Sequence, residues 1–199
     1  MASEANTPVT HDDDLKLLSE YQTERLILRL SSGTLAAKVT EYFIRNRDFL
    51  CDTQTRRPEE YFTSLHQHIL LCADEDAFLR GTAAKYWIFE QNGRDIIGMV
   101  ALSNITKGAF NSCFLSYRLD HRFTGKGYAL EAVKKMVSVA FNTLGLRRIE
   151  AIIMPRNTRA IALVEKLGFE CEGKSRSYLG IRGRWEDHLH MTLLRDGEG

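Results

Sequence analysis

Alternating hydrophobic and polar positions predict the strands of this chain. In the first such segment, residues 23–30, three leucines alternate with a second set that includes two arginines. An Asn-Gly pair at 92–93, between two strand-like segments, is typical of a hairpin turn. Near the C-terminus, residues 181–183 are expected to turn a closing hairpin. Strands are thus predicted at 23–30, 84–90, 95–105, 112–119 and 146–154, and as two runs within 169–194.

Apolar residues at helical spacing predict the helices. After residue 127, Leu130, Val133 and Val137 recur every three or four positions, so one face of a long helix is apolar. A shorter helix ends before Gly168, the residue type that commonly follows a helix C-terminus. The second half of the chain alternates strands with helices, which predicts an α/β fold. Helices are predicted at 34–50, 58–73, 128–144 and 158–167.

Length and composition favour one folded domain. The chain has 199 residues, 44% of them hydrophobic, which suits one domain at 23–195. Residues 1–22 are acidic and are expected to be a mobile N-terminal segment. Apolar runs fall short of the roughly 18–20 residues of a membrane span, and the N-terminus lacks a secretory pattern. A cytoplasmic protein is therefore expected.

Charge and cysteine usage narrow the partners. The formal net charge is +1, but residues 1–20 hold five acidic side chains and one lysine, so the remainder carries +5. That surplus suits a small polyanionic ligand and is too weak to indicate nucleic acid. The cysteines lie far apart without a C-x-x-C pair, so we expect reduced, mostly buried thiols and no zinc site. They are Cys51, Cys72, Cys113 and Cys171.

A glycine turn between a strand and a helix is the main candidate for ligand binding. Gly125 and Gly127 expose the backbone where the unsatisfied N–H groups of a helix start attract an anion. A P-loop requires a lysine and then Ser or Thr directly after its last glycine, whereas Gly127 is followed by Tyr128. A dinucleotide fingerprint requires a third glycine or an alanine where Leu130 stands. What remains is the pattern R-x-x-G-x-G at residues 122–127.

This segment resembles the pyrophosphate loop of the GNAT superfamily of N-acetyltransferases, written Q/R-x-x-G-x-G/A. Residues 154–173, MPRNTRAIALVEKLGFECEG, resemble the second GNAT signature, in which an asparagine follows a strand and a helix ends at Leu-Gly-Phe. Residues 177–194, SYLGIRGRWEDHLHMTLL, are similar to the last hairpin of the ribosomal-protein-alanine N-acetyltransferase subgroup. The resemblance spans residues 23–194 and is sharpest from 112 onward.

The resemblance implies a single domain with a mixed, mostly antiparallel sheet that is splayed between 114–119 and 149–154. Acetyl-CoA, used as co-substrate without a metal, would lie in this gap. Main-chain groups of Tyr117, Arg118 and Leu119 would pair with the pantetheine. The pyrophosphate would lie on the loop Phe123, Thr124, Gly125, Lys126, Gly127, Tyr128 and Ala129, with charge attraction from Arg122 and Lys126. Asn157, Ala160, Leu163 and Lys166 would line the pantetheine arm.

The resemblance also implies that a primary amine attacks the thioester directly in a ternary complex. The backbone N–H near Leu119 is the expected oxyanion donor. Asn157 caps a helix by its position and would also contact the pantetheine. Val164 stands where many family members have a tyrosine acid, which leaves Thr158 as the expected proton donor. Ser177 stands where part of the subgroup has a glutamate base.

The acceptor is expected to be the N-terminal α-amine of a protein, such as a ribosomal protein. At pH 7 roughly 10–15% of α-amines but under about 0.1% of lysines are neutral, so a site without an evident base favours an α-amine. Glu150, Glu170 or Glu172 in the cleft would remove that argument. A small amine, such as a polyamine, an amino sugar or an antibiotic, is the alternative acceptor. A non-catalytic acyl-CoA-binding module is the alternative of another class.

Other partners are limited. His188 and His190 share a strand face but lack an evident third ligand, so no metal is expected. Neither direct nucleic-acid binding nor membrane binding is expected. The oligomeric state is left open between a monomer and a homodimer.

Overall fold

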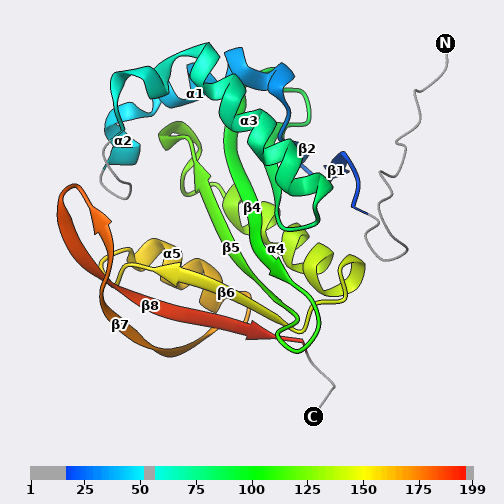
Figure 1. The fold of residues 1–199 in the computed structure, drawn as a ribbon, viewed down its shortest axis with the longest axis vertical. Coiled ribbons are helices and arrows are strands. Elements are labelled where there is room, and N and C mark those ends of the chain that lie inside the picture. The colour runs from blue at the N-terminus through cyan, green and yellow to red at the C-terminus, as the bar shows by residue number, and fades with distance from the viewer. Residues whose placement is uncertain (1–16, 52–56, 196–199) are drawn as a thin grey trace.

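Eight strands form one mixed sheet in the computed structural model, which describes residues 17–51 and 57–195 (Figure 1). The strand order is β1-β2-β3-β4-β5-β6-β8-β7, and every neighbouring pair is antiparallel except β5 with β6. This is the mostly antiparallel α/β architecture that the sequence predicts. The strands are β1 (Glu20–Gln22), β2 (Leu26–Leu30), β3 (Ala84–Glu90), β4 (Ile96–Thr106), β5 (Ser112–Leu119), β6 (Arg148–Ile153), β7 (Glu170–Ile181) and β8 (Arg184–Leu194).

Helices cover both faces of the sheet. Figure 1 shows α3 in front of the sheet, and α4 and α5 behind it. Thr63 begins α3 by accepting a hydrogen bond from the His66 N–H, and α4 continues into a π-helical turn. The helices are α1 (Ala36–Arg45), α2 (Arg47–Cys51), α3 (Ser64–Leu79), α4 (Tyr128–Ser138) and α5 (Thr158–Glu165), with shorter turns η1 (Gly33–Leu35), η2 (Glu59–Phe62), η3 (His121–Phe123) and η4 (Val139–Thr143).

Two hydrophobic clusters hold the layers together. On the α1 and α3 face, Val39 and Phe43 of α1 pack with Trp87 and Met99 of the sheet. On the other face, the apolar stripe of α4 packs against alternate residues of β3 to β6. Because strand side chains alternate between faces, β3 and β4 each contribute to both clusters.

The N-terminal part of the fold differs from the prediction. Glu20–Gln22 form β1, which pairs with β2, and Leu17 and Tyr21 are buried. The sheet therefore begins upstream of the boundary expected at residue 23, whereas residues 1–16 lie outside the described part. Strand β1 has three residues, too few to produce a visible alternation.

Two other expectations concern cysteines and membranes. Cys113 is buried, but Cys72 is half-buried and Cys171 exposed, so the expectation of mostly buried thiols is wrong for those two. All three are free thiols, and the side chain of Cys51 lies outside the described residues. Within the ranges 17–51 and 57–195, no helix combines the length and hydrophobicity needed to cross a membrane.

Candidate active site

A gap opens between the two central parallel strands. Residues 112–114 of β5 pair with 148–150 of β6, and the last pair is Phe114 with Glu150. Beyond it, residues 115–119 and 151–153 continue as strands without pairing to each other. The splay expected in the sheet is therefore present, with its narrow end at Phe114 and Glu150.

Backbone donors of β5 point into this gap. The Asp120 N–H donates to the Ile97 carbonyl of β4 over 2.8 Å. Donors alternate in direction along an antiparallel strand, so the N–H groups of Leu119 and Tyr117 face the opposite side, toward β6. The Arg118 carbonyl faces β4, where a Cβ added to Gly98 would lie 2.5 Å from it. Thus Tyr117 and Leu119, but not the main chain of Arg118, present polar groups to the gap.

Helix α5 lines the gap from the other side. The Tyr117 hydroxyl donates to the Ala160 carbonyl over 3.4 Å, and burial raises the pKa of Tyr117 to about 12, so it stays neutral. Asn157 caps α5 by accepting from the Ala160 N–H at 3.3 Å. Thr158 is exposed at the first position of the helix, whereas Val164 is fully buried in the core. Of the other two arm residues, Leu163 is half-buried and Lys166 exposed.

The glycine turn connects β5 to α4. Gly125 and Gly127 have φ angles of +76° and +82°, a conformation that side-chain-bearing residues rarely adopt. Gly127 is the N-cap of α4, and as a glycine it has no side chain with which to cap that helix. The first N–H groups of α4 therefore lie at an uncapped helix start that carries the positive end of the helix dipole. These are the properties of an anion site.

Arg25 contacts both the glycine turn and α4, a role that the sequence did not predict. Its Nη1 donates to the Lys126 carbonyl over 3.0 Å, and its Nε pairs with Glu131 of α4 at 2.7 Å. The guanidinium lies 4.6 Å above the Tyr128 ring. Although partial burial would raise the pKa of Glu131, hydrogen bonds from Thr23 and Arg25 outweigh it and hold that pKa below its usual range. Arg25 looks like an ordinary polar strand position, so only the tertiary structure reveals it.

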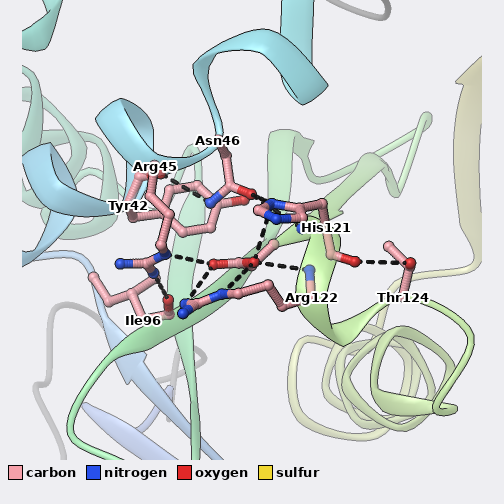
Figure 2. Close-up of polar contacts among 8 residues, drawn as sticks. Tyr42, Arg45, Asn46, Ile96, His121, Arg122 and Thr124 are labelled. Atoms are coloured by element: carbon pink, nitrogen blue, oxygen red, sulfur yellow. Dashed lines mark hydrogen bonds and ion pairs between the residues drawn. The ribbon is translucent and has the colours of Figure 1, made fainter.

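A buried carboxylate ties the turn to α1 (Figure 2). Asp120 is inaccessible to solvent and accepts hydrogen bonds from Arg45 Nε at 2.7 Å and from Arg122 Nε at 3.1 Å. Nearby, Asn46 accepts from the His121 N–H at 3.0 Å. Burial alone would raise the pKa of Asp120, but the hydrogen bonds from Arg122 and Arg45 outweigh burial and hold it well below its usual range.

This network gives Arg122 a structural role besides the expected attraction to phosphates. Its guanidinium is paired with Asp120, a carboxylate that it shares with Arg45, so Arg122 fixes the start of the turn. Its direct attraction to phosphates stays a prediction. Lys126 is exposed, with its ammonium 5.1 Å above the Phe123 ring. Thr124 is half-buried, and its hydroxyl donates to the His121 carbonyl at 3.0 Å.

Ionisable side chains lie on the face of β6 and β8 that points away from α4 and α5. Glu150 stands at the narrow end of the gap and pairs with Arg148 at 2.8 Å, and Glu172 is bonded to the same arginine. Glu170 is exposed. The carboxylates of Glu150 and Glu172 are therefore both paired with Arg148.

The two histidines of β8 do share a face, as alternation predicts. The Tyr178 ring lies 5.6 Å from the His188 ring and 5.4 Å from the His190 ring. The Ser177 N–H donates a hydrogen bond to Asp187 Oδ1, and Ser177 has a φ of +48°. Within the described part of the chain, no group of three or more His, Cys, Asp or Glu side chains is arranged to hold a metal.

Comparison with known proteins identifies the class to which this fold and gap belong. The family model described as "Acetyltransferase (GNAT) domain" matches residues 16–170. The chain therefore belongs to the GNAT family and is an N-acetyltransferase, homologous to ribosomal-protein acetyltransferases.

Individual relatives define the branch. The chain is 32% identical over 171 residues to the [Ribosomal protein uS5]-alanine N-acetyltransferase of Escherichia coli K12, covering 86% of this chain and 88% of the relative. A crystal structure of ribosomal-protein-S5-alanine acetyltransferase from Vibrio fischeri superposes with a TM-score of 0.85 at 31% identity, over 89% and 97% of the two chains. Mycobacterium smegmatis RimJ in complex with CoA-disulfide shares the fold, with a TM-score of 0.81 at 24% identity over 86% and 82%.

Proposed function

We propose that the protein transfers an acetyl group from acetyl-CoA to the N-terminal α-amine of a protein, with a ribosomal protein as the leading acceptor class. The observation that carries the proposal is the gap between β5 and β6, which ends at a glycine turn and an uncapped helix start. A thioester with a long polar arm and a pyrophosphate fits these two features together. The relatives named for alanine acetylation of ribosomal proteins support the acceptor.

Backbone groups supply the cofactor site. Tyr117 and Leu119 offer N–H and carbonyl groups to the pantetheine, which adds to the sheet like a short strand. The arm continues past Asn157 and α5. The pyrophosphate lies on the N–H groups of residues 123–129, where the α4 dipole and the exposed Lys126 favour negative charge.

The transfer joins the two substrates in one complex. The neutral amine forms a bond to the thioester carbonyl carbon, and the carbonyl oxygen takes negative charge that the Leu119 N–H stabilises. Collapse breaks the C–S bond and releases the coenzyme A thiolate. Val164 is an aliphatic core residue and has no proton to give, so Thr158 is the proposed donor to the thiolate. The Thr158 hydroxyl regains the proton that the acceptor nitrogen loses, so that the products are the amide and the coenzyme A thiol. Holding both reactants in the gap supplies much of the rate enhancement.

The acceptor assignment rests on the relatives rather than on a missing base. Glu150 lies at the narrow end of the gap, and its carboxylate is paired with Arg148. The names of the relatives favour a protein N-terminus that begins with alanine.

Thiol release from acetyl-CoA tests the proposal. Two peptides of matched sequence are compared, one with a free N-terminal alanine and one with a blocked N-terminus and a free lysine, with spermidine as a third acceptor. Turnover of only the free α-amine is expected. Turnover of spermidine alone would replace the acceptor class with small amines. Tight acetyl-CoA binding without turnover of any amine would instead indicate an acyl-CoA-binding module.

A further inference from the structure

One part of the sheet face beside the gap is uncovered. Helices α1 and α3 pack over β3 and β4 in the cluster that contains Trp87 and Ala101. Ser116 of β5 pairs with Ala101 and therefore points to the same face, where it is exposed although its strand is central. Within the described residues, Figure 1 shows no helix in front of β6 and β8. We call this surface of β5, β6 and β8 the open face.

Polar side chains of β6 and β8 point to the open face. Ile149, Ala151 and Met191 belong to the cluster under α4 and α5. Because strand side chains alternate between faces, their sequence neighbours Glu150 and His190 point the other way. The open face therefore carries a carboxylate and an imidazole at the narrow end of the gap.

Two carboxylates share one arginine there. Arg148 Nε donates to Glu150 Oε1 over 2.8 Å, and Arg148 Nη1 donates to Glu172 Oε1 over 2.8 Å. The hydrogen bond from Arg148 is the main reason that the pKa of Glu172 lies below its usual range, so this carboxylate is ionised at neutral pH. One guanidinium and two carboxylates give the group a formal net charge of −1.

Glu150 has one carboxylate oxygen that is open to a ligand. Among the described residues, no hydrogen bond reaches Glu150 Oε2, and His190 Nδ1 lies 3.6 Å from it. Ser175 Oγ holds the other side of the imidazole, 2.8 Å from Nε2. The half-exposed Tyr178 ring stands edge-on to His190, with centroids 5.4 Å apart. A long basic side chain therefore has an oxygen for its charge and an aromatic ring for its carbon stem.

The distance from the reacting end matches an extended polypeptide. Glu150 pairs with Phe114, which precedes Leu119 by five residues along β5. At about 3.3 Å per residue, five residues of strand span roughly 17 Å. An extended acceptor with its α-amine at Leu119 covers the same length in about five residues of its own.

We propose that the open face binds the acceptor segment that follows the reacting α-amine, and that Glu150 and Glu172 select a lysine or arginine about five residues from that amine. The inference rests on the proposed function, because it requires a polypeptide with a free N-terminus. The net negative charge is the argument for a basic side chain. An acidic side chain at the same place would add a third carboxylate to two, which disfavours such acceptors.

Peptides that begin with alanine and carry a single arginine test the selection. Arginine is used because its guanidinium stays protonated and does not compete as an acceptor. The arginine is moved from the second to the tenth residue of a neutral peptide. KM is expected to fall about threefold to tenfold when the arginine is near the fifth residue, and to rise when glutamate takes its place. High salt should shrink both effects, because it screens partly exposed charges.

Charge reversal separates recognition from a structural contribution. Glu172→Lys is expected to remove the preference for arginine near the fifth residue and to favour glutamate there. Glu172 is the better position to reverse, because its side chain is 45% exposed and that of Glu150 is 20% exposed. Glu165→Lys is the matched control on α5, behind the sheet, and keeps the wild-type preference. Each variant is compared with its own KM for the neutral peptide, and circular dichroism checks its fold.

The possible results separate this selection from the proposed function. Equal KM values at every arginine position, or a Glu172→Lys variant that still prefers arginine, would overturn the selection while acetylation of the α-amine stands. A preference confined to the second or third residue overturns it as well, since that charge contact lies at the wide end of the gap. A wild-type protein that acetylates spermidine but none of these peptides overturns the proposed function, and the selection with it.

Discussion

The two sides of the gap are built in different ways. On the side proposed for the cofactor, the polar groups are mainly backbone N–H groups of β5, the glycine turn and the start of α4. On the side proposed for the acceptor, the polar groups near β6 are side chains of Glu150, His190 and Ser175, which come from three strands. A backbone site needs only a local conformation, whereas a side-chain site needs the correct register of distant strands. The cofactor side can thus be predicted from a short sequence motif, whereas the acceptor side cannot.

Asp120 connects the glycine turn of the cofactor side to helix α1. Its carboxylate holds Arg45 at the end of α1 and Arg122 at the start of the glycine turn. A buried charge shared in this way is costly to leave unpaired, so removing the carboxylate exposes two guanidinium groups to a poorly solvated site. Substitution of Asp120 is therefore expected to have a larger effect than substitution of a residue on one side of the gap alone.

The largest effect is expected from Asp120→Asn. The variant should lose about 3 kcal/mol of unfolding free energy at pH 7, as expected when one partner of a buried ion pair is removed. Urea unfolding measures the loss, and acetyl-CoA affinity and acceptor KM should both worsen. Glu20→Gln is the control, since it removes a carboxylate that pairs with Arg29 at the surface. A loss of less than about 0.5 kcal/mol, the size of a surface change, would contradict the assigned role.

The same carboxylate predicts a pH dependence. The folded state holds the pKa of Asp120 below its ordinary value of 3.8, so its stabilising contribution is present above that value. It is lost as pH falls below 3.8 toward the lower folded-state pKa. The stability difference between the wild type and Asp120→Asn should therefore be constant from pH 5 to 7 and narrow in more acidic solution.

The next effect isolates the cofactor side. Gly127→Ala places a Cβ 3.3 Å from Arg25 Nη2 at a φ of +82°. We expect acetyl-CoA affinity to fall about tenfold or more, because the first N–H groups of α4 are displaced. Isothermal titration with coenzyme A measures it, and the acceptor KM should change little.

Gly145→Ala is the matched control for Gly127→Ala. Its φ is +62° and a Cβ there meets nothing within 4 Å, so it carries a similar backbone cost of about 1–2 kcal/mol away from the gap. Equal affinity losses in the two variants would show that strain, rather than the turn, explains the result.

Local patterns predicted the elements and the turn for a physical reason. Residues 84–90 and 112–119 are strands with the predicted bounds, and the glycines at 125 and 127 adopt the positive φ that a tight turn requires. These properties depend on neighbours along the chain. The splayed sheet and its family could be inferred from the motifs at 122–127 and 154–173.

Contacts between distant residues could not be predicted. Arg45 and Asp120 are 75 residues apart, and Arg25 and Glu131 are 106 apart. His190 is placed by strand pairing, but the partner Ser175 adjoins a register shift in β7, beyond which simple alternation no longer assigns facing residues. The side-chain contacts at the gap therefore emerge only from the folded structure.

The smallest expected effect tests whether the cofactor side depends on backbone alone. Arg25→Gln removes the ion pair with Glu131 and the bond to the Lys126 carbonyl. We expect coenzyme A affinity to fall about three- to tenfold, because the turn loses the charge-assisted hydrogen bonds that position it. Arg29→Gln is the matched control, since Arg29 also pairs with a carboxylate, Glu20, and stacks over an aromatic ring. If both variants bind coenzyme A like the wild type, the turn holds its shape unaided and the cofactor side is a purely backbone site. A loss confined to Arg25→Gln shows instead that even this side depends on one side chain from a distant strand.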